Sequence, residues 1–166
     1  MLDAIREALV GLPPPVVVAI LSALPISEVR GGIPTGMAMG MPLSQILPIA
    51  IVCNVLSVVP VVLWFNPVVD WLSERGYCRW LVDKLLARAR SKKPMVDKYG
   101  IYALTFLVAV PLPVTGAWTG SLVAAVFKMD FWRALLCMLL GVLIASTIVT
   151  IVSLGGFHAA NSISGG

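Results

Sequence analysis

Two long apolar segments with uncharged interiors constrain this chain more than any other feature of its sequence. They cover residues 44–65 and 131–154, and aromatic residues stand at the end of the first and the start of the second. A helix rises about 1.5 Å per residue and the hydrocarbon core of a bilayer is roughly 30 Å thick, so about 20 apolar residues can cross it. The sequence therefore predicts two full transmembrane helices at these positions.

The small number of charged residues extends this conclusion to the whole chain. Only 12% of the 166 residues are charged and 59% are hydrophobic, whereas a soluble domain carries roughly 25% charged residues. So few charges cannot cover a soluble globule, which excludes a soluble enzyme domain, a disordered chain and a typical nucleic-acid binder. We predict an all-α integral membrane protein with a single membrane domain over residues 1–166, multi-pass in the cytoplasmic membrane, with lipids and no nucleic acid as partners.

The net charge is concentrated in one central segment, residues 66–100. It holds eight basic and four acidic residues, which account for the whole net charge of +4. A basic loop beside transmembrane segments stays cytoplasmic, so we expect a cytoplasmic loop over residues 67–100 and both termini outside. Helical spacing of apolar residues inside the loop, stopped by Pro94, predicts an amphipathic helix over residues 78–90 on the inner leaflet. A nucleic-acid patch is the alternative explanation of these charges.

Two further apolar stretches are too short to cross a bilayer. Residues 15–24 and 101–110 each reach about half-way, and each precedes a proline-containing break and another apolar stretch. Irregular backbone at membrane depth must be buried in protein or line a wet cavity. The pattern predicts two re-entrant helical hairpins, and two kinked full spans, giving four transmembrane helices, are the alternative. The predicted hairpins lie at about residues 13–42 and 101–128.

The pattern T-G-x-x-x-G occurs twice, at residues 35–40 and 115–120. Each copy follows a proline-containing break and precedes a predicted span. Because the two spans flank one cytoplasmic loop, they run in opposite directions, and the two halves of the chain are then inverted relative to each other. Inverted repeats with broken helices are typical of secondary transporters. We predict an inverted repeat whose halves are residues 1–66 and 101–166.

Glu28 and Arg30 are the only charged residues within the first predicted hairpin. A charge at membrane depth costs at least about 2.5–3.5 kcal/mol, and such residues usually face a cavity and serve transport. Glu28 is therefore predicted as a proton carrier beside a cationic Arg30, so that occupancy of the site is coupled to protonation. Two structural explanations stay open: the pair only fixes the hairpin tip, or the tip lies at the membrane surface, where the cost vanishes.

Thr35 and Thr115 are predicted as N-caps of the second helix in each hairpin. A helix N-terminus offers free N–H groups and a positive partial charge, which suit an anion or a polar head group. Close helix packing at the glycines is the structural alternative. Asn54, Ser146 and Thr147 either line the cavity or form interhelical hydrogen bonds. The predicted substrate-binding residues are Glu28, Arg30, Gly32, Pro34, Thr35, Gly36, Pro113, Thr115, Gly116, Trp118 and Thr119.

The stretches PISEVRGGIP (residues 25–34) and PLPVTGAWTG (residues 111–120) resemble the two signature stretches of the small multidrug export protein family. More distantly, the chain resembles the DedA superfamily, which includes polyprenyl-phosphate and phospholipid carriers with paired re-entrant hairpins. In that resemblance Glu28 matches an acidic position of the first hairpin. The second stretch has no arginine where that superfamily carries arginines, so phosphate recognition is not implied there and only Arg30 could supply it.

These observations favour a carrier that moves an amphiphile, an anionic lipid-type substrate such as a polyprenyl phosphate, by alternating access around the two hairpin tips, with proton coupling. The first alternative is a proton-coupled exporter of small hydrophobic or cationic compounds, with Trp118 offering a cation–π contact. The second alternative is a non-transporting membrane scaffold. No enzyme activity, cofactor, metal or catalytic residue is expected, because the sequence lacks the necessary motifs. A homodimer is one arrangement that would shield the helix breaks.

Overall fold

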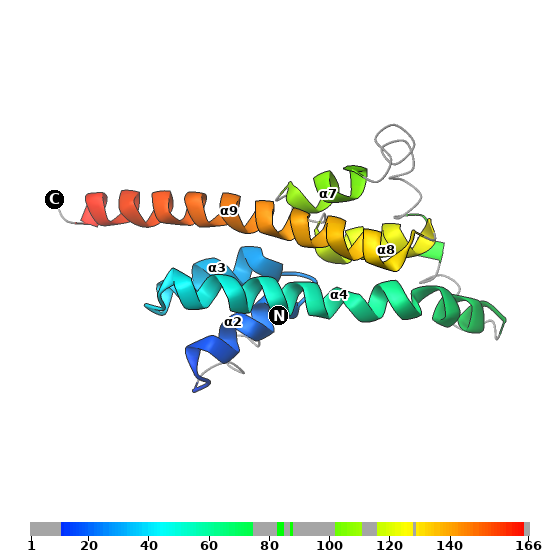
Figure 1. Cartoon of the computed structure of the whole chain (residues 1–166). Coiled ribbons are helices and arrows are strands. Elements are labelled where there is room, and N and C mark those ends of the chain that lie inside the picture. Colours follow the sequence, from blue (N-terminus) through cyan, green and yellow to red (C-terminus); the bar gives the residue numbers. More distant parts are fainter. Residues whose placement is uncertain are drawn as a thin grey trace. The chain divides into compact units, whose positions relative to one another are not determined.

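A computed structural model describes residues 11–74, 83–84, 87, 102–110, 116–127 and 129–164 of the chain. Within these ranges every regular element is a helix, which confirms the predicted all-α class (Figure 1). Apart from residues 83–84 and 87, the predicted amphipathic helix over residues 78–90 lies outside the described residues, as does most of the predicted cytoplasmic loop. The helices are α2 (Pro14–Ala23), α3 (Glu28–Ala38), α4 (Leu43–Glu74), α7 (Tyr102–Ala109), α8 (Ala117–Val126) and α9 (Phe131–Ser164).

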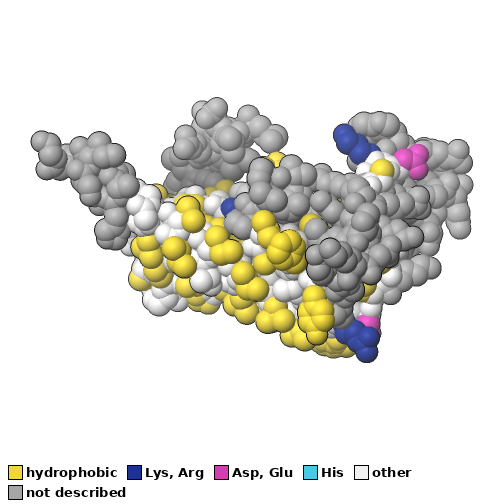
Figure 2. Space-filling model, turned by 90° about the horizontal axis from the view of Figure 1, so that it is seen from above, with side chains coloured by type: hydrophobic (Ala, Val, Ile, Leu, Met, Phe, Trp, Pro, Cys, Tyr) yellow, Lys and Arg dark blue, Asp and Glu magenta, His cyan; other side chains and the backbone are white. Residues whose placement is uncertain are grey.

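The two long helices, α4 and α9, each contain an apolar stretch that could cross a membrane. These stretches are Leu43–Trp64 and Phe131–Gly156, with 22 and 26 residues, which correspond to about 33 and 39 Å of helix. The two predicted spans are thereby confirmed as membrane-span-capable helices. Hydrophobic side chains make up much of the described surface visible in Figure 2, as expected for helices that face lipid.

The first helix pair, α2 and α3, is a hairpin closed by a proline. Pro25 restricts the residue before it to extended conformations, and Leu24 accordingly has φ −72° and ψ 138° and ends α2. The chain then folds back: a Cβ atom on Gly36 of α3 would lie 2.8 Å from Val18 Cγ2 of α2, and one on Gly32 would lie 3.2 Å from the Val18 carbonyl oxygen. The absence of side chains at these two glycines brings the helices into direct contact.

One expectation about this hairpin is wrong. The sequence predicts that Thr35 caps the second helix, which would then begin at Gly36, after the proline-containing break, but α3 starts at Glu28 and continues through Pro34. Proline inside a helix costs about 3 kcal/mol. The contacts of Gly32 and Gly36 with α2 offset that cost. Both glycines lie on one face of a helix only if α3 begins directly after the turn.

The second helix pair, α7 and α8, repeats this way of packing. A Cβ atom on Gly120 of α8 would lie 2.7 Å from Val108 Cγ2 of α7, and one on Gly141 of α9 would lie 2.6 Å from Val108 Cβ. Val108 is therefore held between two glycines. Contacts within the chain define two units, Met1–Asn54 with Ser146–Gly166 and Val55–Ala145; the first contains the α2–α3 hairpin and the second the α7–α8 pair.

The helix positions reveal a repeat with a spacing of 88 residues. α2 starts at Pro14 and α7 at Tyr102, and α4 starts at Leu43 and α9 at Phe131; both pairs of starts are 88 residues apart. The ends of α3 and α8 are separated by the same number. In each half of the chain two short helices are thus followed by one long helix, and these three starts or ends recur 88 residues later.

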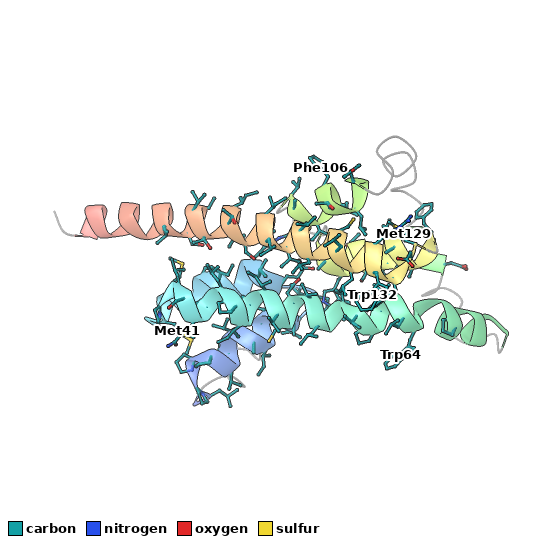
Figure 3. The ribbon with its side chains drawn as sticks, viewed as in Figure 1. Met41, Trp64, Phe106, Met129 and Trp132 are labelled. Carbon is teal, nitrogen blue, oxygen red and sulfur yellow. The ribbon has the colours of Figure 1, made fainter. Side chains whose placement is uncertain are left out.

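The turns that follow α3 and α8 support the same spacing. The Met41 N–H donates to the Gly36 carbonyl at 3.0 Å, and the Met129 N–H donates to the Ala124 carbonyl at 2.9 Å. Both bonds close the end of a helix in the way of a Schellman motif, and donor and acceptor are again 88 residues from their counterparts. Figure 3 labels both methionines, each at the start of a long helix.

The T-G-x-x-x-G match that first suggested a repeat does not pair equivalent positions. Its copies are 80 residues apart, eight fewer than the spacing of the helices. With the helices in register, Thr35 corresponds to Val123 and Thr115 to Ser27. The predicted alignment is therefore wrong, because it followed a short run of identical residues, whereas the helix ends define the repeat. The inverted orientation of the two halves stays a prediction.

The packing of Val108 leads to a stability prediction. Gly141→Ala should lower the free energy of unfolding by about 1–3 kcal/mol, because the new methyl group would overlap Val108 and approach the Thr105 carbonyl oxygen to 2.9 Å. Thermal unfolding of the purified protein in detergent measures this. Gly155→Ala in the same helix is the control, since nothing lies within 4 Å of that position; equal stability of the two variants would contradict the packing described.

Candidate functional site

Few polar side chains are buried in the described part of the chain, and half of them come from the first hairpin and the helix that follows it. Ser22 and Glu28 belong to the hairpin and Asn54 belongs to α4. The buried polar residues are Ser22, Glu28, Asn54, Thr119, Ser121 and Ser146.

Side chains complete the hydrogen bonding at the end of α2. The Asn54 Nδ2 group donates to the Ser22 carbonyl oxygen at 2.9 Å, and the Ser27 hydroxyl donates to the Leu21 carbonyl oxygen. The last carbonyls of a helix have no partner within the helix, and at membrane depth each one left unsatisfied costs several kcal/mol. Of the two roles predicted for Asn54, the structure shows the interhelical hydrogen bond.

Glu28 is held in an unusual backbone conformation. Its φ is +50°, and it is the one non-glycine residue with positive φ among those described. An L-residue in the left-handed region costs roughly 1–2 kcal/mol. Its side chain is nevertheless only 7% exposed. A strained and buried carboxylate at a helix start is the kind of outlier that marks functional sites.

The surroundings of Glu28 bring three kinds of polar group to one end of the hairpin. Glu28 lies one turn before Gly32, on the face of α3 that packs against α2. Ser22 packs on that glycine, since a Cβ atom on Gly32 would lie 2.0 Å from its Oγ atom. Arg30 is half-buried and interacts electrostatically with Glu28. A carboxylate, a guanidinium and a serine hydroxyl therefore belong to one short segment.

This arrangement suits proton uptake. A buried carboxylate is stable when it is paired or when it binds a proton, and Arg30 is the cation that interacts with it. Protonation removes the negative charge of the carboxylate, so the guanidinium can then attract another anion. Among the described residues, no group of three or more His, Cys, Asp or Glu side chains could hold a metal ion.

The other predicted residues of the first hairpin have packing roles in the structure. Thr35 lies in the interior of α3, so the prediction that it is an N-cap is wrong. Pro34 also lies inside α3 and has no N–H to donate to the Arg30 carbonyl. Gly32 contacts α2, and Gly36 contacts both α2 and Ile46 of α4. Whether these residues also touch a substrate stays a prediction.

The second hairpin offers aromatic and hydroxyl groups. The residue that caps the N-terminus of α8 is Gly116, so the prediction that Thr115 caps this helix is wrong: the helix begins one residue later than that cap requires. Trp118 is half-buried and Thr119 is buried, while the Ser121 hydroxyl donates to the Trp118 carbonyl at 2.7 Å. Pro113 and Thr115 themselves lie outside the described residues.

Sequence reasoning missed Ser22 and the strain at Glu28. Ser22 is a lone hydroxyl in the last turn of an apolar helix, just before Pro25, and this position is a signal that could have identified it. The backbone strain at Glu28 has no signal in the sequence, because glutamate is not a residue that favours positive φ.

Comparison with known proteins gives one match, to a family model, and Glu28 is the first matched residue. Residues 28–148 match the model of the family described as "Putative small multi-drug export protein". The match begins at Glu28 and includes α3, α4, α7, α8 and half of α9. No curated protein and no solved structure matches the chain.

The capping role of Asn54 predicts a loss of stability. Asn54→Ala should lower the free energy of unfolding by about 1–3 kcal/mol, because the buried Ser22 carbonyl loses its donor. Val52→Ala is the control in the same helix, since that side chain is exposed. Thermal unfolding in detergent checks the prediction, and equal midpoints for the two variants would contradict the role assigned to Asn54.

The strain at Glu28 predicts that glycine is more stable than alanine at this position, the reverse of the usual order within a helix. Glu28→Gly should be more stable than Glu28→Ala by about 1 kcal/mol, because glycine adopts positive φ without steric cost. Both variants lack the carboxylate, so their difference isolates the backbone. Ala38→Gly, at the exposed end of the same helix, should instead be less stable than the original chain. Thermal unfolding measures all three, and a Glu28→Ala variant as stable as Glu28→Gly would refute the strain.

Proposed function

The chain belongs to the small multi-drug export protein family, and on this premise we propose that it is a membrane carrier for amphiphiles with an anionic head group, driven by protonation of Glu28. The head group competes with the Glu28 carboxylate for Arg30. The proposed location is the cytoplasmic membrane, which the chain crosses more than once.

One observation carries this proposal: Glu28 is buried and strained, and it interacts with Arg30. Both burial of a carboxylate and positive φ at a glutamate destabilise the fold. An ionisable residue inside an apolar membrane protein is a candidate for the transport site by default. A purely structural pair at this position would gain nothing from the strained backbone.

The proposed cycle follows from charge balance. While Glu28 is ionised, it neutralises Arg30. When Glu28 takes up a proton, the positive charge of Arg30 favours an anion, and a guanidinium suits the two oxygens of a phosphate. When the proton leaves on the other side, the pair forms again and the anion is expelled. A proton and one negative charge of the head group thus move together.

The proposed membrane arrangement has α4 and α9 as spans and the helix pairs α2–α3 and α7–α8 as re-entrant hairpins. α2 has 10 residues and α3 has 11, so each is about 15–17 Å long, or half of the hydrocarbon core. The turn between them would then lie near mid-depth. The side-chain hydrogen bonds from Ser27 and Asn54 to the end of α2 support this, because irregular backbone at that depth needs partners within the protein.

A second candidate function is proton-coupled export of hydrophobic cations. The family description supports it, and so does the half-buried indole of Trp118, because an aromatic face attracts organic cations. In this case Glu28 would bind the cation directly and Arg30 would be dispensable. The two candidates therefore differ in what they require of Arg30.

Transport by purified protein in liposomes tests the proposal. A fluorescent polyprenyl phosphate is placed in both leaflets, and its movement is followed by quenching from outside at several pH values. Arg30→Ala should lower the rate about tenfold or more, because hydrogen bonds to charged groups contribute about 1.5–3 kcal/mol. Glu28→Gln should abolish the pH dependence. Arg133→Ala, which removes an exposed arginine of α9, should leave the rate unchanged.

Two other outcomes would replace the proposal. Uptake of a fluorescent organic cation that is lost in Glu28→Gln and kept in Arg30→Ala would favour the cation exporter. Rates equal to those of protein-free liposomes for the original chain and both variants, with intact folding, would leave a non-transporting scaffold.

A further inference from the structure

Most of the buried polar side chains lie in one of the two units of the chain. This unit, Met1–Asn54 with Ser146–Gly166, contains α2, α3, the first part of α4 and the last part of α9. Of the six buried polar residues of the described chain, four belong to it: Ser22, Glu28, Asn54 and Ser146. The interior around Glu28 is therefore polar, and either packing or a bound molecule must account for that.

The burial of the long helices follows the 88-residue register of the repeat. Four positions of α4 that are 0% exposed have counterparts on α9 that are at most 2% exposed. The register therefore identifies the position in the other repeat that is equivalent to each polar residue. The buried pairs are Ile46 and Ala134, Ala50 and Met138, Asn54 and Val142, and Val58 and Ser146.

The sequence of the other repeat has no hydroxyl, amide or carboxylate at the equivalent positions. The same packing is thus achieved there without these polar groups. The Asn54 amide is accounted for by its bond to the Ser22 carbonyl, but the two serine hydroxyls are not accounted for in this way. The counterparts of Ser22, Glu28, Arg30, Asn54 and Ser146 are Val110, Gly116, Trp118, Val142 and Val58.

The hydroxyls of Ser22 and Ser146 are buried and have no hydrogen-bond partner among the residues that the structure describes. Inside a helix a hydroxyl commonly donates to the carbonyl four residues earlier, as Thr150 does to the Ser146 carbonyl at 2.7 Å. The Ser22 hydroxyl lies against Gly32 of α3 instead. A buried hydroxyl without a partner costs about 1–3 kcal/mol, and ordered water is the usual partner of such a group.

Ser146 is the first of three hydroxyl residues on the inner face of α9. Thr150 and Ser153 follow at i+4 and i+7, which places all three on one face of the helix. Ser146 is buried, whereas Thr150 and Ser153 are half-buried. Ile151 and Val152 of the same segment are 65% and 69% exposed. The hydroxyls therefore extend over about 10 Å of helix, from a half-buried position to the buried interior of this unit.

We infer that water enters this unit along Ser153, Thr150 and Ser146 and carries protons to Glu28, and that the Ser22 hydroxyl holds a water molecule near that carboxylate. The inference rests on the proton uptake of the proposed function and specifies its path. Water next to Glu28 gives a proton to the carboxylate and regains one from the next water molecule, so the hydroxyls keep their own protons.

The contacts of this unit support such a path. Asn54, the last residue of the unit on α4, donates to the Ser22 carbonyl, and Ser146 is the first residue of the unit on α9. Ser22 packs on Gly32, one turn after Glu28. Over residues 11–54 and 146–156 the charged side chains are Glu28 and Arg30, and Cys53 is the further titratable group.

The rate of proton uptake tests the inference. Purified full-length protein is mixed rapidly with a weakly buffered solution of lower pH that contains an indicator dye, and the uptake that is lost in Glu28→Gln is assigned to Glu28. Ser146→Val, which introduces the residue of the other repeat, should slow this uptake about tenfold, because water in the path loses a hydrogen-bond partner. Ser146→Thr should keep the rate. Ser121→Ala is the control, since that buried hydroxyl already donates to the Trp118 carbonyl.

The reactivity of introduced cysteines tests for water along α9. Thr150→Cys and Ile151→Cys variants in liposomes are treated with a charged thiol reagent, and mass spectrometry measures modification at the new position. Thr150→Cys should react about tenfold faster or more, because a thiol ionises in water and not in an apolar environment. Exposure alone would give the opposite order, since Ile151 is the more exposed residue. Equal rates, or faster reaction of Ile151→Cys, would overturn the inference.

The outcomes separate this inference from the proposed function. If proton uptake is the same in Glu28→Gln as in the original chain, the proposed function fails. If uptake depends on Glu28 but Ser146→Val keeps the original rate, the path is overturned and the proposed function stands. Uptake that falls with added NaCl but not with choline chloride would show that these oxygens bind a metal cation, which also overturns the path.

Thermal unfolding of each variant excludes a loss of folding. If Ser146→Val does not fold, Ser146→Ala replaces it, because alanine removes the hydroxyl without adding volume. A Ser146→Ala variant that folds and takes up protons at the original rate would overturn the inference equally.

Discussion

The structure depends on one constraint: backbone N–H and C=O groups that leave water must find partners within the protein. Long helices meet it by themselves, and α4 and α9 do so over more than the thickness of a bilayer. A short helix that stops inside an apolar protein does not. At the end of α2 the Ser27 hydroxyl and the Asn54 amide donate hydrogen bonds to carbonyl groups that have no partner within the helix. The turn of the hairpin therefore depends on hydrogen bonds from two polar side chains that lie outside α2.

A second constraint is the lack of a hydrophobic force between helices that are already in lipid. Association then depends on close van der Waals contact, which small residues permit. Val18 faces glycines of α3, and Val108 lies between Gly120 and Gly141. The same solution in both repeats explains why the second short helix of each pair carries a glycine where it contacts the first. It also explains why glycines that would indicate a flexible loop in the sequence lie instead at helix contacts.

These constraints decide how much the sequence could predict. The spans followed from length and apolar composition, and the end of α2 followed from Pro25. The start of α3 did not, because Pro34 and two glycines disfavour a helix locally while their packing on α2 favours it. The register of the repeat was missed for a related reason. Equivalent positions such as Arg30 and Trp118 share a place in the packing but no chemical likeness, so identity of residues cannot align them.

The repeat also distinguishes Glu28 from the residue at the equivalent position of the second hairpin. Its counterpart is Gly116, so the fold can place a residue without a side chain at this point of the hairpin. At Glu28 itself the backbone has positive φ, where glycine would be the easier choice. Packing therefore does not require a carboxylate at this position, and both the strained backbone and the burial make it energetically unfavourable. The remaining reason for the carboxylate is its charge, which can be neutralised by Arg30 or by a proton.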